Sequence, residues 1–265
     1  MGSAVALTLF RAGYGVVIHD SAQPTATRRG MSFCDAIFDG SVSLDGLEGA
    51  RLDDVTEIAS SLASHTSVPV TTLGLPIVLA ALSPGVLVDA RMRKHDQPET
   101  QIGLAPFTVG LGPNFTAGET VHAAVETGWN EELGRVILQG ATRPLEGEPQ
   151  TIAGHARDRY VYAPDAGVFR TALRIGALVT VGQEIARIGA VSLRSPISGA
   201  IRGLTHDGVL VGKKTKVIEV DPRGGAAQIS GIAERPRRIA AGVLEAVQSW
   251  ERGLAESRGG VKTNR

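Results

Sequence analysis

Residues 103–127, which read GLAPFTVGLGPNFTAGETVHAAVET, contain many groups that could bind an anion. The stretch combines glycine amides with short polar side chains, namely Thr108, Gly110, Gly112, Asn114, Thr116 and Gly118. Successive backbone N–H groups in such a loop can form a nest that binds a phosphate or a carboxylate. The alternative is a tight connection between domains, with Phe107 and Phe115 as hydrophobic plugs. Both interpretations stay open at this point.

The segment after these glycines disfavours a nucleoside triphosphatase. In a Walker-type loop the glycines lead into a helix, whose N-terminal amides hold the phosphate. Here the loop leads into ETVHAAVET, in which apolar and polar residues alternate as they do in a strand. The stretch also lacks the Gly-Lys-Ser/Thr that a Walker loop requires.

Charged residues at a predicted strand end are further candidates. VLVDARMRK, residues 86–94, ends a buried strand with Asp89, Arg91 and Lys94. Ligands of open α/β sheets bind beyond the carboxyl ends of the strands, so these three side chains could contact one. Charges that only solvate the strand end are the alternative interpretation.

Three residues near the N-terminus are also candidates for ligand binding. Arg28 and Arg29 follow Pro24 and could grip a phosphate, although an arginine pair is more often a solvated helix face. Asp20 ends the predicted strand GVVIHD, where Rossmann proteins bind a ribose hydroxyl.

Composition excludes several classes of function. The chain has 265 residues, of which 43% are hydrophobic, and its 27 basic residues balance 27 acidic ones. No overall field therefore attracts it to nucleic acid or to an anionic membrane, and no apolar run reaches the roughly 18–20 residues of a membrane span. The scattered histidines and the single cysteine, Cys34, predict no metal site and no disulfide. The cytoplasm is the expected location.

The first half of the chain predicts a Rossmann-like α/β domain over residues 1–102, because helical and strand patterns alternate there. Helices are expected at 2–13, after Pro24 and at 53–65; strands are expected at 15–20, 76–82 and 86–92, with a hairpin around Asp45-Gly46. No strand precedes Met1-Gly2-Ser3, so the first strand and the glycine fingerprint of dinucleotide folds are expected to be missing or to lie upstream.

The second half contains an internal repeat. VYAPDAGVF begins at Val161 and LRSPISGAI begins at Leu193, 32 residues later. At this offset Pro164 matches Pro196, and apolar positions stay in phase. Two interlocking copies predict an all-β barrel-sandwich hybrid, like that of biotinyl and lipoyl carrier domains, over residues 159–223.

The hairpin between the two copies argues against a carrier function. Carrier domains present a lysine there, to which the biotin or lipoyl group is attached. The corresponding stretch here, IGAVSLRS at 188–195, has no lysine, so no such group is expected. The remaining segments are a glycine-rich junction over 103–158 and a C-terminal helix with a tail over 224–265.

Several blocks together resemble one protein family. They are FRAGYGVVIHDSAQPTATRRGMSF, VLVDARMRK, the 103–127 stretch, LGRVI and DGVLVGKKTKVIEVDPR. These blocks are similar to the selenium-dependent molybdenum hydroxylase system protein family (YqeB-type), in order and from about residue 2 to residue 247.

The resemblance implies an accessory protein in the maturation of a molybdenum hydroxylase. We expect such a protein to bind a ligand in an interdomain cleft, either molybdopterin or its dinucleotide form, another nucleotide, or a selenium-bearing intermediate. The expected partners are a hydroxylase subunit or other maturation factors. Arg28, Arg29, Arg91 and Lys94 would neutralise the ligand's charge. Two alternatives stay open, an NAD(P)- or flavin-dependent oxidoreductase and a non-catalytic interaction scaffold. Catalysis, homo-oligomerisation and the part played by selenium are left open.

Overall fold

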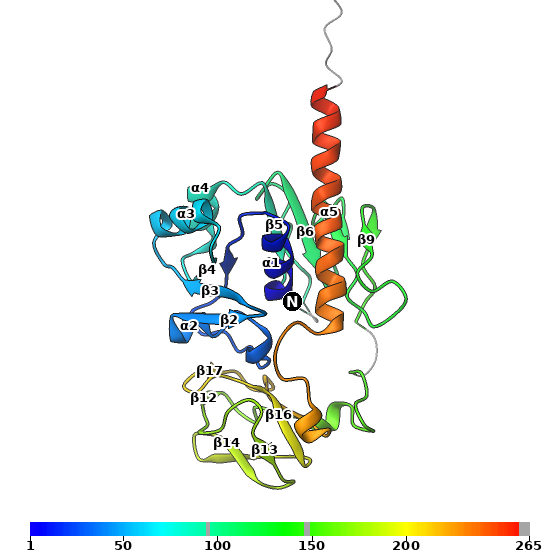
Figure 1. The fold of residues 1–265 in the computed structure, drawn as a ribbon. Coiled ribbons are helices and arrows are strands. Elements are labelled where there is room, and N and C mark those ends of the chain that lie inside the picture. The colour runs from blue at the N-terminus through cyan, green and yellow to red at the C-terminus, as the bar shows by residue number, and fades with distance from the viewer. Residues whose placement is uncertain (94–95, 146–148, 260–265) are drawn as a thin grey trace, which may run out of the picture. The chain divides into compact units, whose positions relative to one another are not determined.

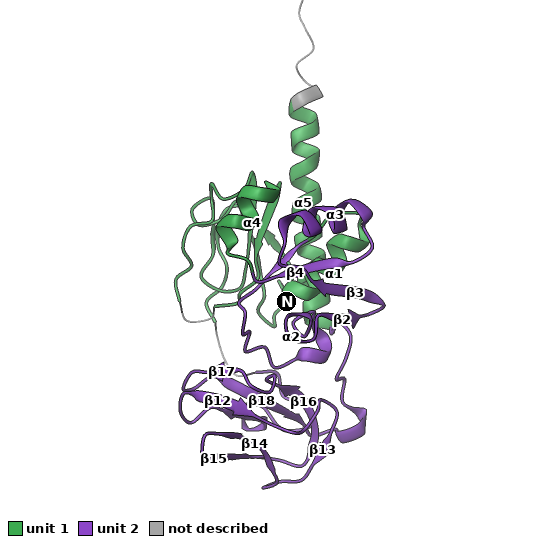
Figure 2. Ribbon diagram, turned by 90° about the vertical axis from the view of Figure 1, so that its left-hand side faces the viewer, with its two compact units in different colours: residues 1–16, 73–146, 234–265 green, residues 17–72, 147–233 purple. Residues whose placement is uncertain are grey.

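The computed structural model describes residues 1–93, 96–145 and 149–259 (Figure 1). The chain divides into two compact units, each assembled from separate segments (Figure 2). Unit 1 comprises Met1–Val16, Leu73–Glu146 and Glu234–Arg265, and unit 2 comprises Val17–Thr72 and Gly147–Ala233.

Unit 1 is built on a four-stranded sheet with the order β5-β6-β8-β9. Its elements are α1 (Gly2–Arg11), α4 (Leu75–Leu82), β5 (Val86–Asp89), β6 (Phe107–Leu111), β7 (Thr116–Ala117), β8 (Ala123–Val125), β9 (Val136–Ile137), β10 (Gly140–Ala141) and α5 (Glu234–Gly259). Strands β5, β6 and β8 are parallel, and β9 is antiparallel to β8. Helix α5 contacts α1 and three strands of this sheet, and its Trp250 stacks on Phe107 with ring centroids 5.2 Å apart.

The first part of unit 2 is a mixed sheet with the order β1-β4-β3-β2. Its elements are β1 (Ile18–His19), η1 (Arg29–Met31), α2 (Ala36–Asp39), β2 (Ser41–Leu44), β3 (Leu47–Arg51), α3 (Val55–Ser64) and β4 (Val68–Thr71). Strands β2 and β3 form the expected hairpin, because Asp45 and Gly46 both adopt the positive φ that a tight turn requires. Asp54 caps α3 by accepting hydrogen bonds from the amides of Thr56 and Glu57.

The second part of unit 2 is two four-stranded antiparallel sheets, with the orders β11-β18-β16-β13 and β15-β14-β12-β17. The elements are η2 (Arg157–Arg159), β11 (Tyr160–Tyr162), β12 (Gly167–Arg170), β13 (Leu178–Val179), β14 (Glu184–Ile188), β15 (Val191–Arg194), β16 (Gly199–Leu204), β17 (Leu210–Val211), β18 (Lys216–Asp221) and η3 (Gly224–Ala226). An apolar core lies between these strands, with Phe169 and Ile201 fully buried in it.

The repeat expected from the sequence is present in the strands. Strands β12, β13 and β14 begin at Gly167, Leu178 and Glu184, and β16, β17 and β18 begin 32 residues later, at 199, 210 and 216. If each strand of one sheet is replaced by the corresponding strand of the other copy, the strand order of the other sheet results. Each sheet therefore takes two strands from each copy, and neither copy can bury its apolar face alone.

The expected fold class is nevertheless wrong. The strands predicted for one Rossmann-like sheet are split, because β1 pairs with β4 in one sheet and β5 pairs with β6 in another. The repeat strands form two open antiparallel sheets, and the described residues contain no closed barrel. Pairing between strands far apart in sequence outweighs the local alternation from which a single doubly wound sheet was inferred.

Two local predictions in the first half are also wrong. Residues 76–82 form helix α4 and not a strand, because Pro76 suits the first turn of a helix and Ser83 ends it in a left-handed conformation. The segment after Pro24 is irregular up to η1 and contains no α-helix. Thr27 instead accepts a backbone hydrogen bond from Leu204 of β16 at 2.7 Å.

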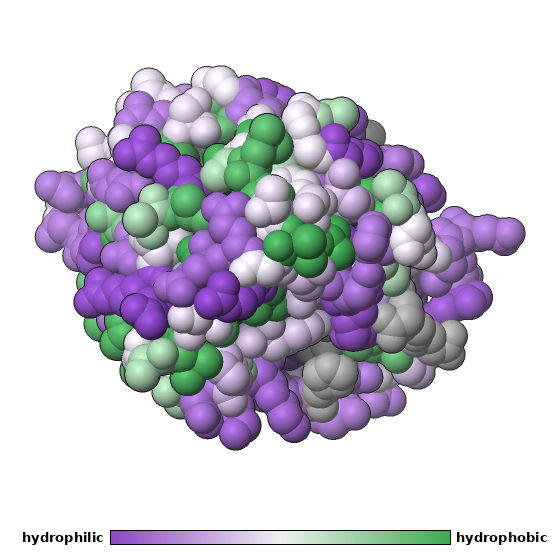
Figure 3. All heavy atoms as spheres, turned by 90° about the horizontal axis from the view of Figure 1, so that it is seen from below, coloured by the Kyte–Doolittle hydropathy of each residue, from purple (hydrophilic) through white to green (hydrophobic). Residues whose placement is uncertain are grey.

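On the face seen in Figure 3, hydrophobic residues lie in small groups separated by hydrophilic ones. Across residues 1–93, 96–145 and 149–259, no helix combines the length and the apolar character that crossing a membrane requires.

Candidate functional site

A buried carboxylate surrounded by cations lies in unit 2. Glu219, in the middle of β18, is fully buried. Four basic side chains approach its two oxygens, and together with it they form the Glu219 cluster: Arg28, Arg159, Arg202, Lys216 and Glu219.

The contacts in the cluster are short. Arg28 donates from Nε and Nη2 to the two carboxylate oxygens at 3.2 and 2.9 Å. Arg159 Nη1 and Lys216 Nζ each donate at 2.5 Å, to different oxygens. Arg202 Nη1 is 3.6 Å from Oε1 of Glu219. The carboxylate is therefore shared among all four cations.

The strand pairing explains why these residues meet. Glu219 pairs with Tyr160 of β11 on one side and with Gly203 of β16 on the other. A Cβ at Gly203 would lie 3.1 Å from Cβ of Glu219 and 3.2 Å from Cβ of Thr27. The absent side chain at residue 203 thus leaves room for the side chain of Thr27 beside β18, and the next residue, Arg28, reaches Glu219.

The electrostatics of the cluster favour the ionised form of Glu219. Burial opposes ionisation, but Arg28 and Lys216 outweigh it and hold the pKa of Glu219 well below its usual range. Burial lowers the pKa of Lys216 to about 8, against the opposing effect of Glu219. Burial, together with the nearby Arg28, also lowers the pKa of Arg202. Burial is therefore the main cost of keeping these two cations charged.

The cluster carries an excess of positive charge. Among the described residues, four cations face one cluster carboxylate, and Asp221, 3.8 Å from Arg202, is itself paired with Arg223 at 2.6 Å. Nε of Arg159, a residue only 2% exposed, is buried without a hydrogen-bond partner among those residues. Uncompensated buried cations are costly, so an anion here would be stabilised.

Solvent reaches the cluster through two of its members. The side chains of Arg28 and Lys216 are 38% and 28% exposed. Nζ of Lys216 also lies 3.5 Å from the ring centroid of Tyr160, a cation–π contact that leaves the ammonium beside an aromatic face. A small anion could contact these two cations without unfolding the strands.

Of the predicted candidates in unit 2, Arg28 alone belongs to the cluster. Arg29 instead pairs with Asp35, with Nε 2.6 Å from Oδ1. Asp20 follows β1 at the surface, where its carboxylate accepts the amide of Ser21 at 2.7 Å. Arg28 and Arg29 therefore form ion pairs with different carboxylates, Glu219 and Asp35.

The predicted candidates at the end of β5 form an ion-pair network in unit 1. Asp89 is buried, and Arg91 donates to it from Nε at 3.0 Å and also bridges to Glu99 at 2.8 Å. Hydrogen bonds to Asp89 raise the pKa of Arg91 above its usual value. Lys94 lies outside the described residues. Asp89 and Glu99 already neutralise the guanidinium here.

The glycine-rich candidates of unit 1 are partly strand. Thr108 and Gly110 lie in β6, where Thr108 Oγ1 is 2.8 Å from Nδ1 of His122, and a Cβ at Gly110 would lie 2.4 Å from the ring of Phe115. The other four surround the turns after β6. Gly112, Asn114 and Gly118 have positive φ, Asn114 donates to the carbonyl of Asp96, and the amide of Thr116 donates to Thr120. The Phe115 plug and the β6 pairing thus occupy much of the expected nest.

Comparison with known proteins supports the expected family. The chain is 37% identical over 247 residues to the uncharacterized protein YqeB of Escherichia coli strain K12, which covers 93% of this chain. The chain is thus similar to YqeB along nearly its whole length. It spans only 45% of the length of YqeB. No family model matches the chain.

Solved structures give only faint likenesses. The succinylglutamate desuccinylase of Silicibacter sp. TM1040 is 17% identical, with a TM-score of 0.24 and coverage of 44% of this chain and 45% of that one. A succinylglutamate desuccinylase/aspartoacylase of Rhodobacter sphaeroides is 14% identical, with a TM-score of 0.22 and coverage of 77% and 84%. Product-bound ectoine utilization protein EutE (DoeB) of Ruegeria pomeroyi is 22% identical, with a TM-score of 0.23 and coverage of 32% and 28%. These scores support no argument about function.

Sequence reasoning missed four members of the cluster, namely Arg159, Arg202, Lys216 and Glu219. A signal was present in KVIEVD, where Glu219 lies between apolar residues of a predicted strand. A carboxylate in that position is buried only when cations accompany it.

Proposed function

We propose that this chain binds a phosphate-bearing ligand at the Glu219 cluster and serves as an accessory protein in the maturation of a molybdenum hydroxylase. The observation that carries the binding proposal is the set of four cations on one buried carboxylate, with Nε of Arg159 unpartnered among the described residues. Guanidinium and ammonium groups are the usual protein partners of phosphate.

The accessory role rests on the sequence. Similarity to YqeB supports the family whose resemblance implied this role. Molybdopterin and its dinucleotide form are the ligands that we expect for an accessory protein of this kind. Both ligands carry phosphate, so the cluster fits the charge of either. The oxidoreductase alternative loses its main support, because the Rossmann-like sheet on which it depended is not formed.

The binding proposal is tested by calorimetry with inorganic pyrophosphate in a chloride buffer. The wild-type chain should show saturable binding with a Kd below about 1 mM. K216M should weaken this binding at least tenfold, whereas the matched control K214M, at an exposed lysine two residues away, should leave it unchanged. Equal effects of the two variants would reject the cluster as the site.

The accessory role needs a separate measurement. Calorimetry with molybdopterin cytosine dinucleotide should give tighter binding than pyrophosphate, again reduced by K216M. Pyrophosphate binding without any binding of the dinucleotide would retain the anion site and reject its assignment to the molybdenum cofactor.

A further inference from the structure

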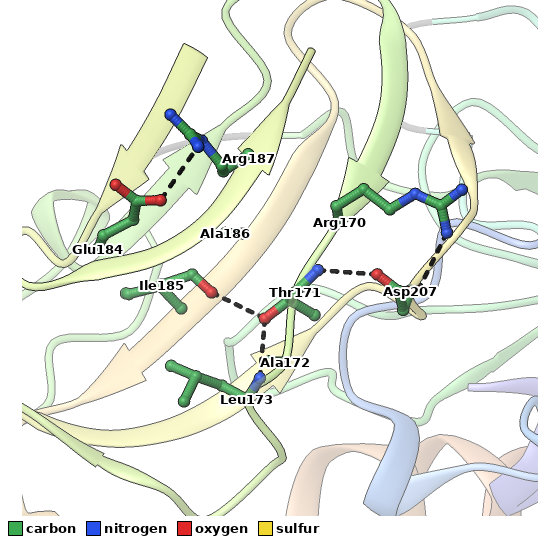
Figure 4. A pocket seen from close by; sticks show the side chains of 9 residues that line it. All are labelled: Arg170, Thr171, Ala172, Leu173, Glu184, Ile185, Ala186, Arg187 and Asp207. Atoms are coloured by element: carbon green, nitrogen blue, oxygen red, sulfur yellow. Dashed lines mark hydrogen bonds and ion pairs between the residues drawn. The ribbon is translucent and has the colours of Figure 1, made fainter. Parts of the chain in front are cut away.

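A second, open version of the Glu219 site exists in the other copy of the repeat. A shift of 32 residues relates Arg202, Lys216 and Glu219 to Arg170, Glu184 and Arg187. The latter three line a groove of about 510 Å³ between the ends of β12 and β14 (Figure 4). The pairing in the two copies begins alike, because Phe169 pairs with Ile188 as Ile201 pairs with Val220. It then differs, because Arg187 pairs with Arg170, whereas the register shifts after Ile201 and Glu219 pairs with Gly203.

In the second copy, residues 23–28 of this chain occupy the position that corresponds to the groove. The carbonyl of Thr27 accepts the amide of Leu204 at 2.7 Å, and Arg28 forms an ion pair with Glu219 at 2.9 Å. Oε1 of Gln23 accepts the amide of Leu210 at 3.2 Å. The segment of residues 23–28 therefore contacts this copy and places one charged side chain on β18.

In the first copy, no described segment takes that place. The counterpart of Leu204 is Ala172, which is exposed, and no described residue accepts its amide. The pairing of β12 with β14 ends at Arg170, and beyond it Oγ1 of Thr171, instead of a backbone amide, donates to the carbonyl of Ile185 at 2.7 Å (Figure 4). The groove thus retains an unpaired donor on its rim.

The charges at two of the corresponding positions are exchanged between the copies, because Glu184 and Arg187 replace Lys216 and Glu219. Arg187 stands at the position of Glu219, and its pair with Glu184 is 3.4 Å long with both side chains more than 40% exposed. Arg170 pairs with Asp207 at 3.2 Å, also at the surface. Exposed pairs of this kind are weak and can exchange partners. A carboxylate, in place of the arginine of the occupied site, would therefore complement Arg187.

We propose that the groove between β12 and β14 binds an extended peptide whose backbone carbonyl accepts the amide of Ala172 and whose acidic side chain pairs with Arg187. The bound peptide would make the same kinds of contact with the first copy that residues 23–28 make with the second copy. The site is separate from the Glu219 cluster and does not depend on the ligand proposed there.

The test uses two fluorescein-labelled hexapeptides and fluorescence anisotropy. One has the sequence of residues 23–28, QPTATR, and the other carries R28E. The acidic peptide should bind the wild-type chain at least fivefold more tightly than the basic one, and R187E should reverse the preference. K214M serves as a control that changes a surface charge elsewhere and should leave the preference unaltered.

Three results would overturn the proposal: no binding of the acidic peptide at millimolar concentration, equal binding of both peptides, or a preference that survives R187E in a protein with wild-type circular dichroism. A second readout does not depend on any variant. In ¹⁵N–¹H spectra of the wild-type chain, the acidic peptide should shift the Ala172 amide, and an unmoved Ala172 resonance at saturation would contradict the backbone contact.

Discussion

Replacing Glu219 by glutamine tests how strongly the cluster depends on its one carboxylate. The variant keeps the shape of the side chain but removes the charge shared by Arg28, Arg159, Lys216 and, at 3.6 Å, Arg202. Breaking a buried ion pair from one side costs about 3–5 kcal/mol, which at about 2–4 °C per kcal/mol lowers Tm by about 6–20 °C.

The assay is thermal unfolding of E219Q with and without inorganic phosphate, monitored by circular dichroism. Because the variant has four uncompensated cations, phosphate should raise its Tm more than that of the wild-type chain. E184Q is the matched control, since the Glu184 pair with Arg187 is exposed and worth less than about 1 kcal/mol. A Tm within about 2 °C of wild type for E219Q, or no gain from phosphate, would refute the reasoning.

Three further predictions concern single residues. The ratio of the pyrophosphate affinities of the wild-type chain and K216M, measured by calorimetry, should be largest below pH 8 and fall above it, because Lys216, with a pKa of about 8, loses its charge there. The titration of pyrophosphate itself affects both proteins alike, and a ratio that does not change with pH would contradict this. G110A should destabilise the chain by about 1–3 kcal/mol in urea unfolding, because its methyl group would lie 2.4 Å from Phe115; an unchanged midpoint would contradict this. Burial raises the pKa of Cys34 to about 12, so its thiol should react with iodoacetamide only after denaturation, and rapid labelling of the native chain would count against the structure.

Local patterns predicted much of the secondary structure but not the pairing of the strands. The acidic start and apolar spacing of 53–65 predicted α3, and Asp45-Gly46 predicted the hairpin of β2 and β3. The spacing of apolar residues cannot show that β5 pairs with β6 and not with the strands of the β1-β4-β3-β2 sheet, because strand pairing depends on contacts between residues far apart in the sequence. The predicted single α/β sheet was wrong for this reason.

The candidate site was predicted only in part, because its members are distant in sequence. Arg28 was selected as a phosphate ligand, but its partner Glu219 lies 191 residues away. The adjacent Arg29 was selected on the same grounds and is held by Asp35. The repeat, in contrast, was detectable because its matches share one fixed offset, and it relates the cluster to the groove at Arg187.

We propose above that the Glu219 cluster binds phosphate, which is a tetrahedral oxyanion. The most direct measurement is X-ray diffraction at the tungsten edge from crystals of the full chain soaked in tungstate, a phosphate analogue. An anomalous peak is expected within hydrogen-bonding distance of Nζ of Lys216 and the guanidinium of Arg28. Tungstate bound elsewhere, with no peak at these two side chains, would contradict it.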